Sequence, residues 1–155
     1  MIARRAVSLT KHFTVAASRA RVFSFLINPR NTSQWLTELK YVSHRPRGEV
    51  AVGSEVLCKV SAFGFTRNAT FRFAAVDFPS FFRSEGASNG IAYKSEMLIS
   101  GTNAEMASAL DWTIEITLPK LLPLGDQLIS NTISKDMDKG IEIIKTTLME
   151  PNSYG

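Results

Sequence analysis

Residues 129–148, ISNTISKDMDKGIEIIKTTL, carry an apolar residue at every third or fourth position. This period places the apolar side chains on one stripe of an α-helix. We predict an amphipathic helix of about 24 residues, capped by Asp126 or beginning as early as Leu121. Gly140 lies within it, at a cost of roughly 1 kcal/mol relative to alanine. Either another segment approaches closely there or the glycine is simply tolerated, which is the commoner case. The stripe consists of Ile129, Ile133, Met137, Ile141, Ile144 and Leu148.

The segment before this helix, from Tyr41 to Leu118, is typical of successive β-strands joined by tight turns. Apolar and polar residues alternate within it, which is the period of a strand with one buried face. Asn89-Gly90 is the strongest turn signal, because a type I′ hairpin needs positive φ at both central residues. Further turns are predicted at Arg47-Gly48, Val52-Gly53, Phe63-Gly64, Asp77-Phe78-Pro79 and Gly101-Thr102-Asn103. We therefore predict six strands here, including 55–62, 65–76, 91–99 and 105–116.

The N-terminal segment predicts one more strand and two short helices. Residues 7–16 alternate as a half-buried strand does. Ser18 then caps a helix that Asn28-Pro29 ends, because the residue before proline avoids helical geometry. A second short helix, capped by Asn31 or Thr32, runs through Trp35, Leu36 and Leu39. The order strand, two helices, six strands, long helix predicts an α+β fold.

Size and composition predict one globular domain over residues 1–155, with its core in residues 6–150. The chain has 155 residues, of which 45% are hydrophobic and 21% charged, which is ordinary for a soluble domain. Cys58 is the one cysteine, so no intramolecular disulfide forms. No signal peptide or membrane span is evident. Together these features predict a cytoplasmic protein.

Charge is distributed unevenly along the chain. Residues 1–76 carry twelve Lys and Arg against three acids, and residues 77–155 carry six against eleven. The first part is therefore at +9 and the second at −5, which sum to the net charge of +4. Such asymmetry suits an anionic membrane surface or a carboxylate ligand, and also an ordinary solvated surface. Nucleic-acid binding is not expected, because the basic run at Arg45-Pro46-Arg47 is short and lacks interleaved aromatic residues.

The order of elements and seven short motifs resemble the START-like (SRPBCC, birch-pollen-allergen-like) superfamily, in its polyketide cyclase/dehydrase and lipid-transport branch. The resemblance spans residues 6–150. It implies a helix-grip fold, in which a seven-stranded curved antiparallel sheet surrounds the long C-terminal helix. The motifs are Phe13-Thr14-Val15-Ala16-Ala17, Val22-Phe23, Asn28-Pro29 with Asn31 and Trp35, Val52-Gly53-Ser54, Val76-Asp77-Phe78-Pro79, Gly101-Thr102 and Leu148-Met149-Glu150.

The resemblance implies a cavity between sheet and C-terminal helix, but it does not choose a function. We expect the cavity to bind or carry an apolar small molecule such as a lipid or a polyketide. One alternative is a cyclase, aromatase or dehydratase that acts by shaping its substrate. Another is a protein-interaction module like the chaperone co-regulators of this superfamily. The oligomeric state stays open.

Strand alternation predicts which residues face the cavity, since the charged face of each strand must be solvated. We expect a cavity of at least about 300 Å³. Tyr93 is the main polar candidate inside. Arg67 has inward parity as well, unless a bulge near Gly64 turns it to solvent. Trp35 either closes the mouth or anchors its helix to the sheet. The expected lining is Trp35, Arg67, Phe71, Phe73, Tyr93, Met97, Leu110, Trp112, Ile133 and Met137, with Met106 also on the inner face.

The sequence contains no catalytic signature, so catalytic residues stay unassigned. His12 and His44 are the only histidines, and both alternate outward. Without a Cys/His cluster we expect no metal site, and without a phosphate or dinucleotide motif we expect no cofactor. Glu85 is the one sheet carboxylate whose direction the pattern leaves open, and a surface position is favoured for it.

Overall fold

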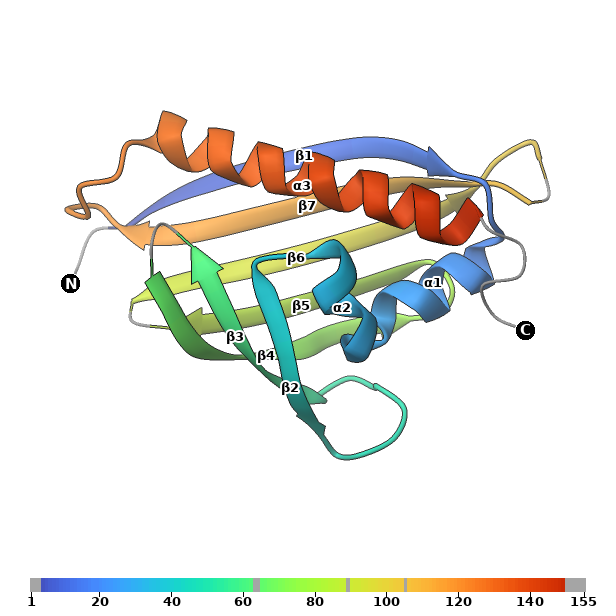
Figure 1. The fold of residues 1–155 in the computed structure, drawn as a ribbon, viewed down its shortest axis with the longest axis horizontal. Coiled ribbons are helices and arrows are strands. Elements are labelled where there is room, and N and C mark those ends of the chain that lie inside the picture. The colour runs from blue at the N-terminus through green and yellow to red at the C-terminus, as the bar shows by residue number, and fades with distance from the viewer. Residues whose placement is uncertain (1–3, 63–64, 89, 105, 150–155) are drawn as a thin grey trace.

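The computed structural model describes residues 4–62, 65–88, 90–104 and 106–149. It has seven strands and three helices in the order β1, α1, α2, β2 to β7, α3 (Figure 1). The first part consists of β1 (Arg4–Val15), α1 (Arg19–Ile27), α2 (Pro29–Trp35) and β2 (Leu39–Arg45). The second consists of β3 (Glu55–Ala62), β4 (Phe65–Asp77), β5 (Phe81–Ser88), β6 (Ile91–Gly101), β7 (Ser108–Pro119) and α3 (Asp126–Met149).

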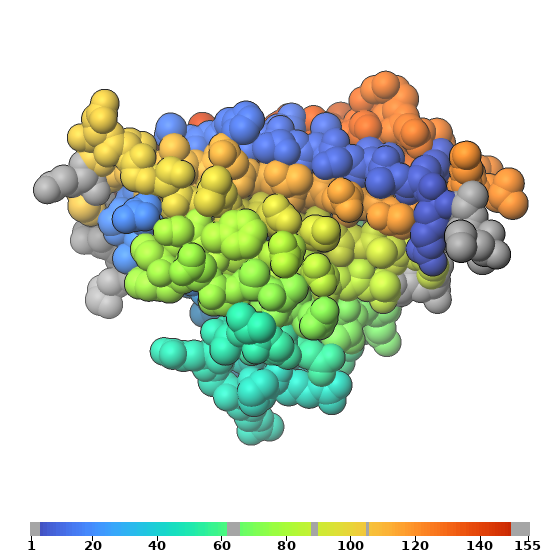
Figure 2. All heavy atoms as spheres, turned by 180° about the vertical axis from the view of Figure 1, so that it is seen from behind, coloured from blue at the N-terminus to red at the C-terminus, as the bar shows by residue number. Residues whose placement is uncertain are grey.

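The strands form one antiparallel sheet in the order β1-β7-β6-β5-β4-β3-β2. All three helices lie against one face of this sheet, which we call the inner face (Figure 1). The other, outer face is seen from behind in Figure 2, with β4 to β7 side by side and the β2–β3 hairpin projecting below. The predicted α+β helix-grip fold is confirmed.

The short helices begin and end where small local signals place them. The Ser18 side chain accepts a hydrogen bond from the Arg21 amide, so its predicted N-cap is confirmed. The predicted start and end of the second helix were wrong, since α2 ends at Trp35 and Leu39 begins β2. Asn28 caps α2 by accepting from the Arg30 amide, and Pro29 is its first residue. Proline suits that position because its missing N–H would have no helical partner there.

The predicted start of the last strand needs correction, and two of the predicted turns lie at least partly outside the described residues. The last strand begins at Ser108 rather than 105, and Met106 is 63% exposed in the preceding turn. A threonine organises that turn, because the Thr102 hydroxyl contacts the main chain of both Ala104 and Ala107. The turns at Phe63-Gly64 and Asn89 lie outside the described residues. Gly48, Gly53 and Gly90 have positive φ, as turns at these glycines require.

The predicted helix α3 is confirmed at 24 residues, with its whole apolar stripe buried. Gly140 contacts another segment rather than being merely tolerated. A Cβ atom there would lie 2.4 Å from the Trp35 carbonyl oxygen and 3.3 Å from the Trp112 ring. The missing side chain therefore lets the end of α2 approach α3 closely. Trp35 then packs edge-on against Trp112, with ring centroids 5.2 Å apart.

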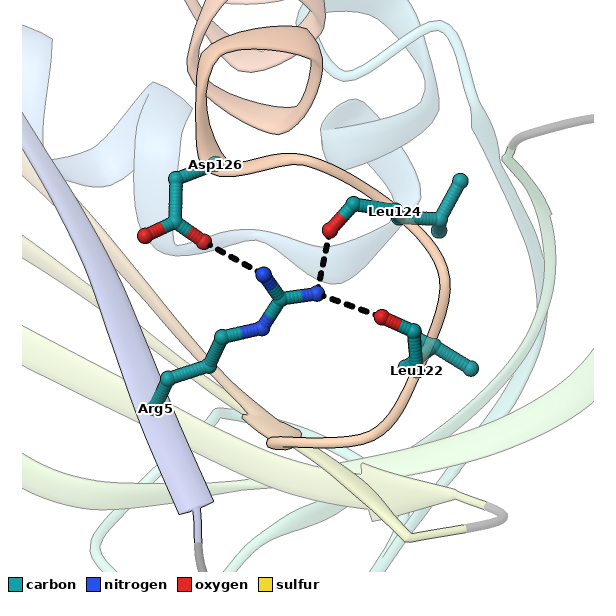
Figure 3. A network of polar contacts seen from close by, with 4 residues as sticks. All are labelled: Arg5, Leu122, Leu124 and Asp126. Atoms are coloured by element: carbon teal, nitrogen blue, oxygen red, sulfur yellow. Dashed lines mark hydrogen bonds and ion pairs between the residues drawn. The ribbon is translucent and has the colours of Figure 1, made fainter.

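An arginine fixes the loop that enters α3 (Figure 3). The Arg5 guanidinium pairs with the Asp126 carboxylate at 2.8 Å. It also donates to the carbonyl oxygens of Leu122, at 2.8 Å, and Leu124. Asp126 is thus in the first turn of α3 and is neutralised by Arg5. This clamp ties the start of the long helix to β1.

A row of alternating charges crosses the outer face. The Cα register aligns six residues from β2 to β7, each beside a residue of opposite charge. Two pairs are close, Arg45–Glu55 at 3.1 Å and Arg72–Glu85 at 3.4 Å. Glu85 is therefore an outer-face carboxylate, as favoured. The row is Arg45, Glu55, Arg72, Glu85, Lys94 and Glu115, and we call it the charge row.

Candidate functional site

A cavity of about 90 Å³ lies between the inner face of the sheet and the short helices. Its walls come from α1, α2, the link to β2, the first residue of β2, and strands β4 to β7. We call it the inner cavity. Its described lining is Leu26, Thr32, Trp35, Leu36, Leu39, Phe71, Phe73, Phe82, Ser84, Tyr93, Lys94, Ser95 and Ile114. Most of these side chains are aromatic or aliphatic, which is typical of a site for an apolar molecule.

The inner cavity is smaller than predicted and lies elsewhere. We expected at least about 300 Å³ against the C-terminal helix, whereas the described lining residues include none from α3. The cause is the packing around Gly140, where α2 and the Trp35–Trp112 pair occupy the space below α3. The remaining space is displaced toward α1 and the middle of the sheet.

The ten residues predicted as lining fall into three groups. Trp35, Phe71, Phe73 and Tyr93 do line the inner cavity. Met97, Leu110, Trp112, Ile133 and Met137 are buried core residues that do not border it. Arg67 does not border it either. A ligand role for the second group would need a rearrangement of the core.

Arg67 keeps the inward parity that the sequence predicted. The β3–β4 pairing runs through Val60 and Arg67 without a register shift, so no bulge turns the strand there. Arg67 is half-buried, and no described residue forms a hydrogen bond or ion pair with it.

Two polar atoms in residues of the inner cavity are cut off from solvent and have no partner. They are Trp35 Nε1 and Tyr93 Oη. An unmade hydrogen bond of this kind costs about 1–3 kcal/mol. The other tryptophan is different, because Trp112 Nε1 donates to Ser95 Oγ at 3.1 Å. These two groups are therefore buried without a hydrogen bond.

The Tyr93 hydroxyl lies over a glycine in the neighbouring strand. A Cβ atom on Gly86 would lie 2.5 Å from Tyr93 Oη and 2.8 Å from the Thr70 carbonyl oxygen. Glycine at this position therefore provides the space for the phenol ring. Burial raises the pKa of Tyr93, with a smaller contribution from Cys58, so the hydroxyl keeps its proton. Burial likewise raises the pKa of Cys58 to about 11, which keeps this thiol unreactive.

Strand alternation missed a pair of carboxyl groups between α3 and the link after α2. Asp136 forms a side-chain hydrogen bond with Glu38. Burial first, and then this contact, raise the pKa of Asp136 to about 6, whereas Lys139 opposes the shift. The available signal was positional, since Asp136 precedes Met137 of the buried stripe and Glu38 precedes the inward Leu39.

A larger hollow of about 590 Å³ lies on the outer face of the sheet. One wall is the charge row from Glu55 to Glu115, and the other contains Thr70, Ala87, Ala92 and Thr117. The hollow is deep at Gly86, Ala87 and Ala92 because these residues have little or no side chain. Within its charged wall, Arg72 and Glu85 form an ion pair at 3.4 Å, and Lys94 and Glu115 are opposite each other in the register.

The described residues provide little for acid–base or metal chemistry. No group of three or more His, Cys, Asp and Glu among them could hold a metal ion. His12 is exposed and pairs with Asp111, and His44 contacts Tyr41 and Gly48. Neither histidine borders the inner cavity. None of the three described helices has both the length and the hydropathy needed to cross a membrane.

Comparison with known proteins agrees with this architecture. The family model described as polyketide cyclase / dehydrase and lipid transport matches residues 6–149. No curated protein matches the chain in sequence.

Solved structures show the same fold at low identity. The chain is similar to norcoclaurine synthase from Thalictrum flavum, with 12% identity, a TM-score of 0.66, and 96% and 89% of the two chains covered. A START superfamily protein from Mycobacterium smegmatis is 11% identical, with a TM-score of 0.72, and 92% of this chain and 97% of that chain are covered. The di-domain ARO/CYC StfQ from the steffimycin biosynthetic pathway is 10% identical, with a TM-score of 0.74, and 95% of this chain and 52% of that chain are covered. These likenesses show the shared fold, and the family match over almost its whole length shows that the chain belongs to the polyketide cyclase / dehydrase and lipid transport family.

Proposed function

We propose that this protein binds or carries a small, largely apolar molecule in the inner cavity. The observation that carries the proposal is an aromatic-lined space at the centre of the grip, bordered by Phe71, Phe73, Phe82 and Tyr93. The family description, which names lipid transport beside cyclisation and dehydration, supports the same role. A buried lone thiol, Cys58, supports a cytoplasmic location for it.

The size of the cavity limits the ligand. At about 90 Å³ it is smaller than the roughly 150 Å³ engineered cavity that accepts benzene. A compact ring or short chain needs modest widening. A longer lipid or polyketide requires α2 to move off the sheet, which separates Trp35 from Trp112.

An enzyme of the cyclase, aromatase or dehydratase type is the alternative. The described lining contains hydroxyl groups but neither a carboxyl group nor an imidazole. Tyr93 holds its proton too firmly to act as a base near neutral pH. Catalysis would thus depend on holding the substrate in a reactive shape, which makes carriage the better supported role. A protein-interaction module with a vestigial cavity is the third possibility.

Native mass spectrometry of the protein purified from its own cells tests the proposal. A bound small molecule that is released on unfolding supports carriage, and its turnover by the pure protein would favour the enzyme. Ser84→Met should fill the inner cavity and abolish retention, because Ser84 is buried in its wall. Ser100→Met, on the exposed side of β6, is the matched control. Equal retention by both variants would contradict the assignment of the site.

We also propose an anionic membrane surface as a partner for the end of the molecule that carries the α3 entry loop. Leu121 is 92% exposed there, on a loop that Arg5 holds in place (Figure 3). Arg4 and Lys120 are exposed beside it, while Arg5 neutralises Asp126. An exposed leucine beside exposed cations suits an anionic lipid headgroup layer.

Co-sedimentation with vesicles tests this partner. Binding should require phosphatidylglycerol in the vesicles, and Leu121→Ser should weaken it roughly tenfold, since a buried leucine side chain is worth about 1.5–3 kcal/mol. Leu98→Ser is the control, because Leu98 is 43% exposed on β6, away from this loop. Equal binding to neutral vesicles, or equal losses in both variants, would contradict the proposal.

A further inference from the structure

The charge row on the outer face is complementary to its own reverse. From β2 to β7 its charges are plus, minus, plus, minus, plus and minus, because each residue is the register partner of the next. In the opposite direction the same row is minus, plus, minus, plus, minus and plus. Two copies of the row that face each other in opposite directions therefore place every charge over an opposite one.

Part of the charge row is not compensated within the chain. Arg72 and Glu85 form an ion pair at 3.4 Å. Lys94 and Glu115 are register partners, but neither forms an ion pair with any described residue. Both are only partly exposed. Opposite charges on a facing molecule would compensate them.

Of the two-fold axes that place the row over itself, only one pairs opposite charges. An axis along the row would place each charge over its own copy. An axis along the strands, between β4 and β5, reverses the row and places β3 over β6 and β4 over β5. Glu55 then faces Lys94 of the second copy, and Arg72 faces Glu85. The symmetry repeats each contact, as in every isologous interface.

The same axis places an exposed leucine over the hollow of the outer face. Leu57 is 40% exposed on β3 and is the register partner of Thr70, so it lies in the cross-strand line next to the charge row. On β6 this line contains Ala92, which borders the hollow of about 590 Å³. Leu57 of each copy therefore faces the space that small side chains leave in the other.

From these features we propose that the outer face (Figure 2) is a docking surface for a second copy of this chain, related by a two-fold axis along the strands. The sheet curves around its helices, so its outer face is convex and the central strands β3 to β6 make the contact. Such an interface is small and polar, and we expect a weak dimer that salt dissociates. The proposal does not depend on what the inner cavity binds.

Sedimentation of the full chain at increasing concentration tests for the dimer. At about 0.01 M salt, where the Debye length is about 30 Å, dimers should form below a protein concentration of about 1 mM. In 1 M sodium chloride, where this length is about 3 Å, the dissociation constant should rise at least roughly tenfold. A chain that stays monomeric in low salt, or a dimer that salt does not weaken, would overturn the proposal.

Two complementary variants test the direction of the axis. Lys94→Glu places a carboxylate over Glu55 of the second copy, and Glu55→Lys places an ammonium over Lys94, so neither variant should dimerise with itself. An equimolar mixture restores both contacts and should dimerise about as tightly as the parent. A fold defect cannot produce this recovery. Circular dichroism verifies that each variant is folded, and folded variants that do not recover in the mixture would overturn the pairing of β3 with β6.

A matched control separates the charge row from net charge. Lys94→Glu lowers the net charge from +4 to +2, which by itself weakens the repulsion between copies. Lys135→Glu makes the same change at an exposed position of α3, on the other side of the sheet, and should dimerise at least as well as the parent. Loss of the dimer in both variants, or in neither, would overturn the role of the charge row.

Leu57→Ser tests the hollow without a change of charge. It should weaken the dimer roughly tenfold, because each copy loses the burial of one leucine side chain. Leu128→Ser is the control, since Leu128 is 53% exposed on α3, and it should leave the dimer unchanged. Equal dissociation constants for Leu57→Ser and the parent would overturn the placement of β3 over the hollow.

Discussion

Asp136 and Glu38 place two carboxyl groups in direct contact between α3 and the link after α2. Two ionised carboxylates at this distance repel each other, so the contact is favourable while one of them keeps a proton. Burial first, and then this contact, raise the pKa of Asp136 to about 6 from an ordinary 3.8. Asp136 is only partly buried, so solvent weakens the effect.

This pair predicts a pH dependence of stability. Between about pH 4 and pH 6 the folded protein binds more protons at Asp136 than the unfolded chain does, so the unfolding free energy falls as pH rises through that window. Asp136→Asn should flatten this slope and raise stability at pH 7 relative to the parent, because the amide can donate to Glu38. Urea unfolding at pH 4.5 and 7 measures both effects. Glu142→Gln, on the exposed side of α3, should keep the parent slope, and a flattened slope there would contradict the assignment.

Gly86 is the second position where one residue sets local structure. A methyl group there would meet Tyr93 Oη and the Thr70 carbonyl oxygen. Gly86→Ala should therefore lower the unfolding free energy by about 1–3 kcal/mol through overpacking. In combination with Tyr93→Ala the added loss should be smaller, because one of the two clashes disappears. A double-mutant cycle by chemical denaturation measures this coupling, and strictly additive losses would contradict the contact.

Among the elements, α3 depends on one glycine for its place. Gly140→Ala gains helix propensity of roughly 1 kcal/mol, but its methyl group would overlap the Trp35 carbonyl oxygen at 2.4 Å. The clash is with main chain, so α2 and α3 must separate. We expect a net loss of about 1–2 kcal/mol in unfolding free energy. Thr146→Ala, at an exposed position of α3, should be neutral or stabilising. A stabilised Gly140→Ala would show that the approach of α2 is not tight.

The helices and strands could be predicted from the sequence where the signal for them is local. The stripe of α3 predicted its length, and the Ser18 cap and Asn28-Pro29 stop predicted the limits of α1. The start of α2 was not predicted correctly, because Pro29 both ends one helix and is a favourable first residue of the next. The volume of the cavity could not follow either. It depends on how Trp35, Trp112 and Gly140 meet, and these residues lie far apart in the sequence.

For the candidate site, alternation was sufficient to orient side chains but not to place helices over them. Phe71, Phe73 and Tyr93 point inward as predicted and border the inner cavity. Met97 and Leu110 also lie on the buried face, but there the core is filled. Which part of an inner face stays open is decided by the covering helices, and that information is spread over the whole chain.

At the scale of the molecule, the charge row ties six strands into one register. A slip of β5 by two residues against β4 would place Arg83, or Ala87, opposite Arg72 instead of Glu85. Like charges opposite each other destabilise a strand pair, so the row disfavours such slips. The pairs are partly exposed and each contributes little alone. Their effect is to favour one register of the strands rather than to add much to the stability of the sheet.

Glu85→Lys tests the charge row. It would place a third cation beside Arg72 and Arg83, with Lys94 opposite, and should lower the unfolding free energy by about 1–2 kcal/mol at low salt. In 1 M sodium chloride most of this loss should vanish, because the Debye length falls to about 3 Å. Glu142→Lys, on the exposed side of α3, is the control. A loss in Glu85→Lys that does not change with salt would show that packing, not charge, is responsible.

The contact between the two indole rings has an optical consequence. Trp35 and Trp112 are the only tryptophans, their rings are 5.2 Å apart at 75°, and both are almost fully buried. The intrinsic fluorescence of the folded protein therefore comes from a single water-free pair beside the inner cavity. Emission moves to longer wavelength when an indole meets water, so lifting α2 from the sheet changes the colour of the emitted light before the chain unfolds. The protein carries its own unlabelled reporter for the motion that a large ligand would require.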